Sequence, residues 1–117
     1  MKRLYLSFRF ASEGVLLWLK SEKNFLLQVC MGVSVLACGL FFKISSMEWI
    51  AILICCAIVL SLEMMNTAIE QLADAVDTNH NIAIKRVKDI AAGAVMLAAI
   101  VSTVIALIIF IPKILNY

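Results

Sequence analysis

The stretch LEMMNTAIEQLADAVD, residues 62–77, follows an uncharged run that begins at Ile50. At 100° per residue its polar side chains fall within an arc of about 80° on one side of a helix; they are Glu63, Asn66, Glu70, Asp74 and Asp77. A carboxylate at the end of an apolar span costs several kcal/mol to desolvate when it has no partner. We therefore expect a helix that crosses a membrane, carries an acidic stripe where it leaves the bilayer, and faces cationic groups there.

The composition is that of a membrane protein. The chain has 117 residues, of which 64% are hydrophobic and 15% charged, whereas a soluble domain has roughly 45–50% apolar residues. Three segments can cross a hydrocarbon core of about 30 Å, and we expect spans over about 23–42, 48–69 and 90–112 within a single domain, 1–117. Apolar residues that alternate with charges over about 8–21 are typical of a helix lying on the membrane surface.

The predicted fold is therefore an all-α membrane protein with three transmembrane helices and an N-terminal amphipathic surface helix. A chain this short cannot enclose a large cavity by itself, so we also expect self-association. Eight of the basic residues precede the first span or lie between the second and third, and only Lys43 and Lys113 lie on the other side. The positive-inside rule then places the N-terminus and the acidic stripe in the cytoplasm. The net charge of +2 carries little information, and we expect no nucleic-acid partner.

Two carboxylates of the stripe suit different tasks. Glu63 falls at or just inside the cytoplasmic boundary of the membrane, where partial loss of water makes its carboxylate a better proton acceptor. Glu70 faces water and stays ionised. Oxygen ligands without a His or Cys cluster favour Mg²⁺, which one or two carboxylates commonly hold together with a substrate phosphate. Glu22, at the start of the first span on the same membrane face, is a second candidate ligand. An equal alternative is a solvated Glu22 paired with Lys23.

Lys88 and Asp89 are predicted to open the third span. An acid at a helix start is favoured by the helix dipole, so Asp89 has an ordinary capping explanation. A lysine there is unfavourable unless an anion such as a nucleotide phosphate is nearby, which makes Lys88 a candidate phosphate ligand. His80, the only histidine, is by itself more typical of a surface residue. The four glycines form neither a Walker A nor a GxGxxG loop, so any ATP is bound without a soluble kinase loop.

Several segments resemble signature segments of the prokaryotic diacylglycerol kinase and undecaprenol kinase family. They are EMMNTAIE at 63–70 followed by Asp74, KDIAAGAV at 88–95, FASEG at 10–14 and EKNF at 22–25. The resemblance covers nearly the whole chain. It implies a homotrimeric bundle in the bacterial inner membrane, with active sites shared between subunits. The implied reaction transfers the γ-phosphate of ATP to the hydroxyl of a membrane lipid at the cytoplasmic surface.

The resemblance also implies roles for individual residues. Glu63 would be the general base with Asn66 as its helper, Glu22 and Glu70 would hold Mg²⁺ with the phosphates, and Asp74 would support the site. The implied nucleotide contacts are Arg3, Phe10, Glu22, Glu70, Asn79, His80, Asn81, Lys88 and Asp89.

The acceptor lipid is open between two alternatives. Thr67 and the apolar run after Asp89 look more like the undecaprenol kinases of Gram-positive type, so undecaprenol is favoured over diacylglycerol. A small transporter subunit is the alternative that is not an enzyme. It would need polar groups along a path across the membrane, whereas here the candidate polar residues gather at one face.

Overall fold

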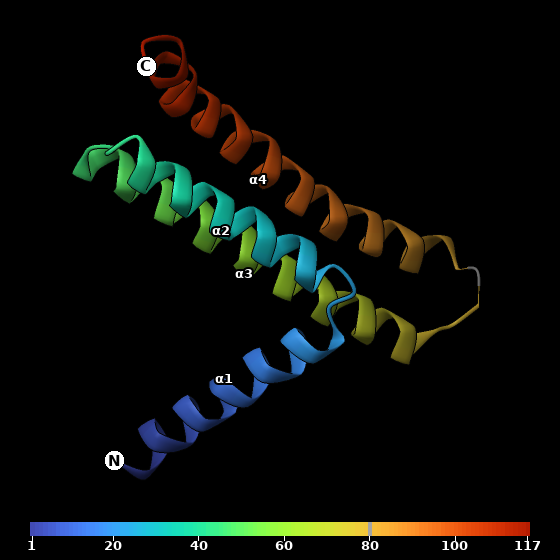
Figure 1. The fold of residues 1–117 in the computed structure, drawn as a ribbon. Helices are drawn as coiled ribbons and strands as arrows, with labels where there is room; N and C mark the ends of the chain where they lie inside the picture. The colour runs from blue at the N-terminus through green and yellow to red at the C-terminus, as the bar shows by residue number, and fades with distance from the viewer. Residues whose placement is uncertain (80) are drawn as a thin grey trace.

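The computed structural model describes residues 1–79 and 81–117, which form four α-helices and no strand (Figure 1). The helices are α1 (Lys2–Ser21), α2 (Phe25–Phe41), α3 (Ser46–Val76) and α4 (Ile82–Leu115). α3 and α4 make the most extensive helix contact, α2 runs beside them, and α1 projects away from the bundle (Figure 1). The all-α architecture predicted from the sequence is confirmed.

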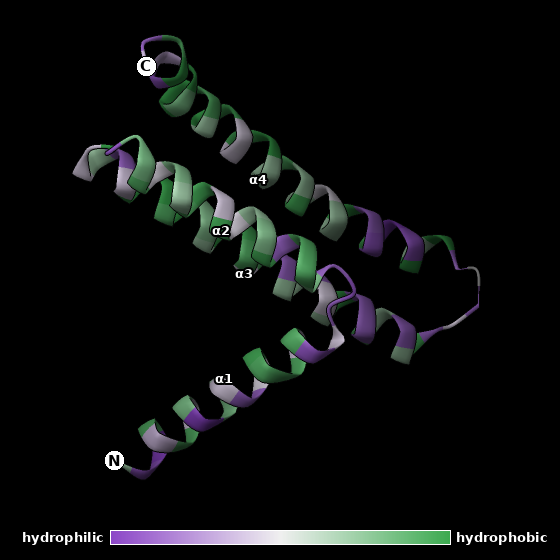
Figure 2. Cartoon of the chain, in the orientation of Figure 1, coloured by the Kyte–Doolittle hydropathy of each residue, from purple (hydrophilic) through white to green (hydrophobic). Residues whose placement is uncertain are grey.

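Among the described residues two helices, α3 and α4, are long and apolar enough to cross a membrane, and the bent pair of α1 and α2 passes the same test of length and composition if it is counted as one span. With 31 and 34 residues, α3 and α4 extend about 46 Å and 51 Å, more than a hydrocarbon core of about 30 Å. The chain bends by 106° between α1 and α2. Figure 2 shows apolar residues over most of α4 and polar residues where α3 leads into α4 and around the α1–α2 break. The polar groups thus gather toward one end of the bundle.

The bounds of α1, α2 and α4 differ from those expected. α1 begins at Lys2 rather than near residue 8, and α2 spans Phe25–Phe41 rather than 23–42. α4 begins at Ile82 rather than between 85 and 90, because the side chain of Asn81 accepts a hydrogen bond from the Ala83 N–H at 2.9 Å and caps the helix there.

The earlier start of α4 changes the reading of two candidate residues. Lys88 and Asp89 lie almost two turns inside the helix, whereas the dipole effect fades within the first turn. The helix-start explanations predicted for them are therefore wrong. Both residues must instead be understood from the side chains that they contact.

The turn between α2 and α3 is closed by backbone and side-chain caps. Lys43 adopts the left-handed conformation, with φ of 52°, and the N–H of Ile44 donates to the Gly39 carbonyl at 3.2 Å, which together end α2 in a Schellman motif. Ser45 and Glu48 then form a reciprocal capping box that starts α3, with distances of 2.8 Å and 3.2 Å. The chain therefore reverses direction over the few residues between α2 and α3.

The internal core lies at this turn end of the bundle. Ile44, Ile52 and Ile109 are buried together, and Glu48 accepts a hydrogen bond from Lys113 at 3.1 Å, which joins the start of α3 to the end of α4. In the described part of the chain only six hydrophobic residues are buried. Most apolar side chains of the isolated protomer are thus left for lipid or other subunits to cover. The polar end of the bundle, by contrast, carries the candidate site.

Candidate active site

A pocket of about 340 Å³ opens where the α1–α2 break faces α3. Its lining is rich in acids and amides: Ser21, Glu22, Lys23, Asn24, Gln28, Glu63, Asn66, Thr67, Glu70 and Val95. The pocket brings Glu22 together with three residues of the acidic stripe, Glu63, Asn66 and Glu70. The prediction from the helical period, that Glu63, Asn66 and Glu70 lie on one face of α3, agrees with their place in one pocket.

Two amides hold two of the carboxylates. Gln28 Nε2 donates to Glu63 Oε2, and Asn66 Nδ2 donates to Glu70 Oε1 at 3.4 Å. Glu63 is half-buried and Glu70 is exposed, which is the difference in solvation that their positions predict. The carbonyl oxygens of Gln28 and Asn66 are buried and have no hydrogen-bond partner among the described residues. The pocket thus combines held carboxylates with amide oxygens able to accept further hydrogen bonds.

Glu22 is oriented by its own backbone neighbourhood. Its Oε1 accepts a hydrogen bond from the Asn24 N–H at 3.1 Å. The alternative predicted for Glu22, an ion pair with Lys23, is not present between these two described residues. The Glu22 carboxylate is therefore held at the pocket lining by a backbone N–H, and among the described residues it has no ion-pair partner.

The donor set fits Mg²⁺ only in company with a phosphate. In residues 1–79 and 81–117 no three Asp, Glu, His or Cys side chains lie close enough to form a complete metal cage. Mg²⁺ is usually bound by one or two carboxylates together with substrate phosphates and water, rather than by an all-protein cage. Glu22 and Glu70, which line the same pocket, provide two such carboxylates. Phosphate oxygens would complete the coordination.

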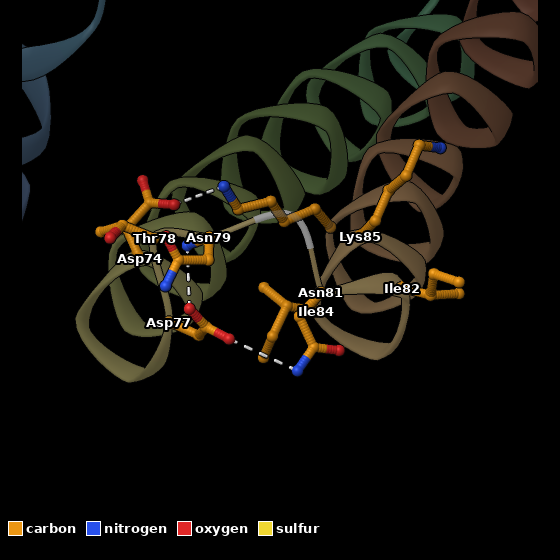
Figure 3. A pocket seen from close by; sticks show the side chains of 9 residues that line it. Asp74, Asp77, Thr78, Asn79, Asn81, Ile82, Ile84 and Lys85 are labelled. Atoms are coloured by element: carbon orange, nitrogen blue, oxygen red, sulfur yellow. Dashed lines mark hydrogen bonds and ion pairs between the residues drawn. The ribbon is translucent and has the colours of Figure 1, made fainter.

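A second pocket, of about 440 Å³, lies at the α3–α4 connection (Figure 3). Its described lining is Asp74, Asp77, Thr78, Asn79, Asn81, Ile82, Ile84, Lys85 and Lys88. Lys88 Nζ pairs with Asp74 Oδ1, which provides the cation expected opposite the stripe. Asp77 accepts hydrogen bonds from the Asn79 N–H at 2.8 Å and from Asn81 Nδ2 at 3.4 Å, both drawn in Figure 3. These contacts hold Asn79 and Asn81 against Asp77, in the same pocket as the lysine that an incoming anion would have to reach.

The remaining candidates for nucleotide binding lie elsewhere. Arg3 and Phe10 are exposed on α1 and line neither pocket. Asp89 pairs with Lys85 at 2.6 Å on the surface of α4. His80 lies outside the described residues. In a single protomer the described residues predicted to bind the nucleotide are thus divided among the two pockets and the surfaces of α1 and α4.

Gln28 is the pocket residue that sequence reasoning missed. It is the only amide in the apolar run of residues 25–42, and a polar side chain inside a span normally faces other protein groups rather than lipid. A single amide in an apolar run was therefore the signal from which Gln28 could have been found. Its partner, Glu63, lies 35 residues away, so helical periodicity alone could not pair them.

The fold and pocket define a small helical membrane protein that gathers carboxylates and amides beside an apolar bundle. The sequence pattern of the family described as "Prokaryotic diacylglycerol kinase" matches residues 9–110. The chain is 37% identical over 113 residues to the undecaprenol kinase of Bacillus subtilis (strain 168), covering 97% of this chain and 92% of that protein. It is 31% identical over 114 residues to the diacylglycerol kinase of Synechocystis sp., covering 97% of this chain and 65% of that protein.

The chain therefore belongs to the prokaryotic diacylglycerol kinase family. It is a lipid kinase of the membrane, and ATP is the phosphoryl donor that such a kinase implies. This confirms the family resemblance and the enzyme class predicted from residues 63–70 and 88–95. The transporter alternative is excluded.

Proposed function

We propose that this protein phosphorylates undecaprenol to undecaprenyl phosphate with ATP and Mg²⁺, at the cytoplasmic face of the bacterial inner membrane. The observation that carries the proposal is the pocket in which Glu22, Glu63, Asn66 and Glu70 meet beside the apolar helices. The similarity to an undecaprenol kinase over almost the full length of both chains favours this acceptor. The similarity to a diacylglycerol kinase, over 65% of that protein, makes diacylglycerol the alternative. The excess of basic residues around the N-terminus and the α3–α4 connection supports the cytoplasmic side.

In the proposed reaction Glu63 is the general base. The lipid hydroxyl oxygen attacks the γ-phosphorus, its proton passes to the Glu63 carboxylate, and the bond from the γ-phosphorus to the bridging oxygen breaks to release ADP. General-base catalysis of this kind contributes about 10²–10⁴-fold in rate. Glu63 is half-buried in a polar pocket that adjoins apolar helices. A lipid alcohol at the bilayer surface would thus meet the base without leaving the membrane.

The other residues align and neutralise the triphosphate, which is most of what phosphoryl transfer requires from a protein. Glu22 and Glu70 would hold Mg²⁺, and the bound ion would neutralise charge on the phosphate oxygens. Lys88 would exchange its pairing with Asp74 for a phosphate oxygen. The further nucleotide contacts in the proposal are Arg3, Phe10, Asn79, His80, Asn81 and Asp89.

We also propose that the protein works as a homotrimer whose active sites combine residues of neighbouring subunits. Two observations support this part of the proposal. The described candidate nucleotide contacts of one protomer are divided among two pockets and the surfaces of α1 and α4. Moreover, only six hydrophobic residues are buried among those that the structure describes, so a protomer has extensive apolar surface available for partners.

The acceptor is tested with purified protein in nanodiscs or mixed micelles. The protein is given ATP labelled at the γ-phosphate, with undecaprenol and diacylglycerol in separate reactions, with and without EDTA, and the lipid-soluble label is counted. We expect rapid Mg²⁺-dependent labelling of undecaprenol and slower labelling of diacylglycerol. Faster labelling of diacylglycerol would establish the alternative, and labelling of neither would overturn the proposed reaction.

A further inference from the structure

We propose that Gln28 is a positioning residue for Glu63, an inference that rests on the proposed role of Glu63 as the base. Gln28 Nε2 on α2 donates a hydrogen bond to Glu63 Oε2 on α3. Both side chains are half-buried and line the same pocket. Among the described residues this is the only hydrogen bond that joins α2 to α3. The bond therefore ties the orientation of the base to the packing of a neighbouring helix.

The hydrogen bond addresses a specific weakness of glutamate as a base. The terminal torsion of a glutamate side chain has a broad, roughly two-fold energy profile, so a carboxylate without a partner rotates over a wide range. With Oε2 held by the amide of Gln28, Oε1 is the oxygen left to take the proton of the acceptor hydroxyl. A misplacement of about 1 Å in a reacting group can reduce the rate about 10²-fold. We therefore expect turnover to fall strongly when the terminal torsion of Glu63 is no longer fixed by Gln28.

The chemical nature of the partner matters as much as its position. A neutral amide orients a carboxylate without bringing a positive charge, whereas a lysine would favour the ionised form and weaken the carboxylate as a proton acceptor. The same helix shows the contrast, because Asp74 is paired with Lys88 while Glu63 is paired with Gln28. On this helix the lysine thus pairs with Asp74 and not with the acid that must accept a proton.

The amide of Gln28 has one defined orientation. Its nitrogen must face the Glu63 carboxylate, which directs its carbonyl oxygen to a buried position where it has no partner among the described residues. Buried acceptors without partners are uncommon and need a reason. Holding the base is the reason that we assign to this side chain.

The test compares Gln28→Met, which keeps length and loses the N–H donor, with Gln28→His, which restores an N–H donor. Gln71→Leu is the matched control, because Gln71 is an exposed amide on α3 that lines neither described pocket. Each full-length variant is purified as the assembled oligomer, and kcat, the KM for ATP and nucleotide binding are measured. We expect Gln28→Met to lose about 10–100-fold in kcat with an unchanged KM for ATP. Gln28→His and Gln71→Leu should stay within about five-fold of wild type.

Further variants separate this inference from the proposed function and guard against misfolding. If Gln28 acts through Glu63, Gln28→Met should cause no additional loss in a Glu63→Gln background, since the effects of residues that act as a unit are not additive. Should Gln28→Met fail to assemble, Gln28→Ala takes its place. A slow Glu63→Gln enzyme with a fully active Gln28→Met enzyme would overturn the role of Gln28 alone. A fully active Glu63→Gln enzyme would instead overturn the proposed base.

Discussion

Three carboxylates on one face of α3 have three different partners. Glu63 accepts from the Gln28 amide, Glu70 from the Asn66 amide, and Asp74 from the Lys88 ammonium. They also differ in solvation, because Glu63 is half-buried while Glu70 and Asp74 are exposed. The same chemical group is thus prepared for different tasks by its neighbours. At the residue scale, solvation separates Glu63 from Glu70, which both have amide partners, and a cationic partner separates Asp74 from both.

The first prediction concerns the proposed base. Glu63→Gln keeps the size of the side chain and an oxygen that can accept from Gln28, but a glutamine cannot take up the hydroxyl proton. We expect turnover to fall by about 10²–10⁴-fold, while the oligomer assembles and nucleotide affinity stays near that of wild type. Steady-state kinetics and titration with a fluorescent nucleotide measure the two effects. Activity within a few-fold of wild type would show that Glu63 is not the base.

The second prediction concerns the proposed metal ligand. Glu70→Ala removes one of the two carboxylates assigned to Mg²⁺, and even the loss of a group that only supports a metal ligand costs roughly 10–100-fold in metal affinity. We expect a weakening of at least about tenfold in Mg²⁺-dependent nucleotide binding. Glu13→Ala is the control, because Glu13 pairs with Arg9 on α1 and lines neither described pocket. An Mg²⁺ titration identical to that of wild type would remove Glu70 from the metal site.

At the scale of the helices, the sequence predicted the faces of single helices better than it predicted how the helices pack on one another. The period of 3.6 residues places Glu63, Asn66 and Glu70 on one face, and α3 is regular enough for that to hold. The start of α4 was missed because charged residues at 85, 86, 88 and 89 interrupt the hydrophobic pattern, although the helix already begins before them, at the cap formed by Asn81. The partnership of Gln28 with Glu63 depends on how α2 packs on α3. No period within either segment encodes that packing.

The third prediction concerns the turn end of the bundle. A Cβ added at Gly39 would lie 2.6 Å from Cη2 of Trp49, so the α2–α3 contact leaves no room for a side chain there. We expect Gly39→Ala to lower the free energy of unfolding by about 1–3 kcal/mol through overpacking. Gly32→Ala, on the same helix, meets nothing within 4 Å and should be neutral or slightly stabilising. Unfolding of the detergent-solubilised protein measures both, and equal stabilities would contradict the close contact.

At the scale of the whole molecule, the protomer has a small internal core at one end and a polar site at the other. Ile44, Ile52 and Ile109 form the core beside the α2–α3 turn, while the two pockets lie at the α1–α2 break and the α3–α4 connection. Most apolar side chains that the structure describes are thus left exposed on the protomer. Lys88 and the carboxylates of the first pocket line different pockets of one protomer. Lys88 and these carboxylates can therefore serve one active site within a subunit or a site shared by two subunits, and only the arrangement of the subunits decides between the two.

The fourth prediction distinguishes these two arrangements by mixing inactive variants. Glu70→Ala damages the carboxylate side of the site and Lys88→Ala the lysine side, so each homo-oligomer should be nearly inactive. If neighbouring subunits share a site, random mixing in equal amounts leaves about one site in four with both sides intact, and about a quarter of wild-type activity should return. If both residues serve a site within one protomer, every site in the mixture keeps one defect and no activity returns. The variants carry different affinity tags, and tandem purification verifies that mixed oligomers have formed before the lipid-soluble phosphate is counted. A verified mixture without recovered activity would place Glu70 and Lys88 in the site of a single subunit.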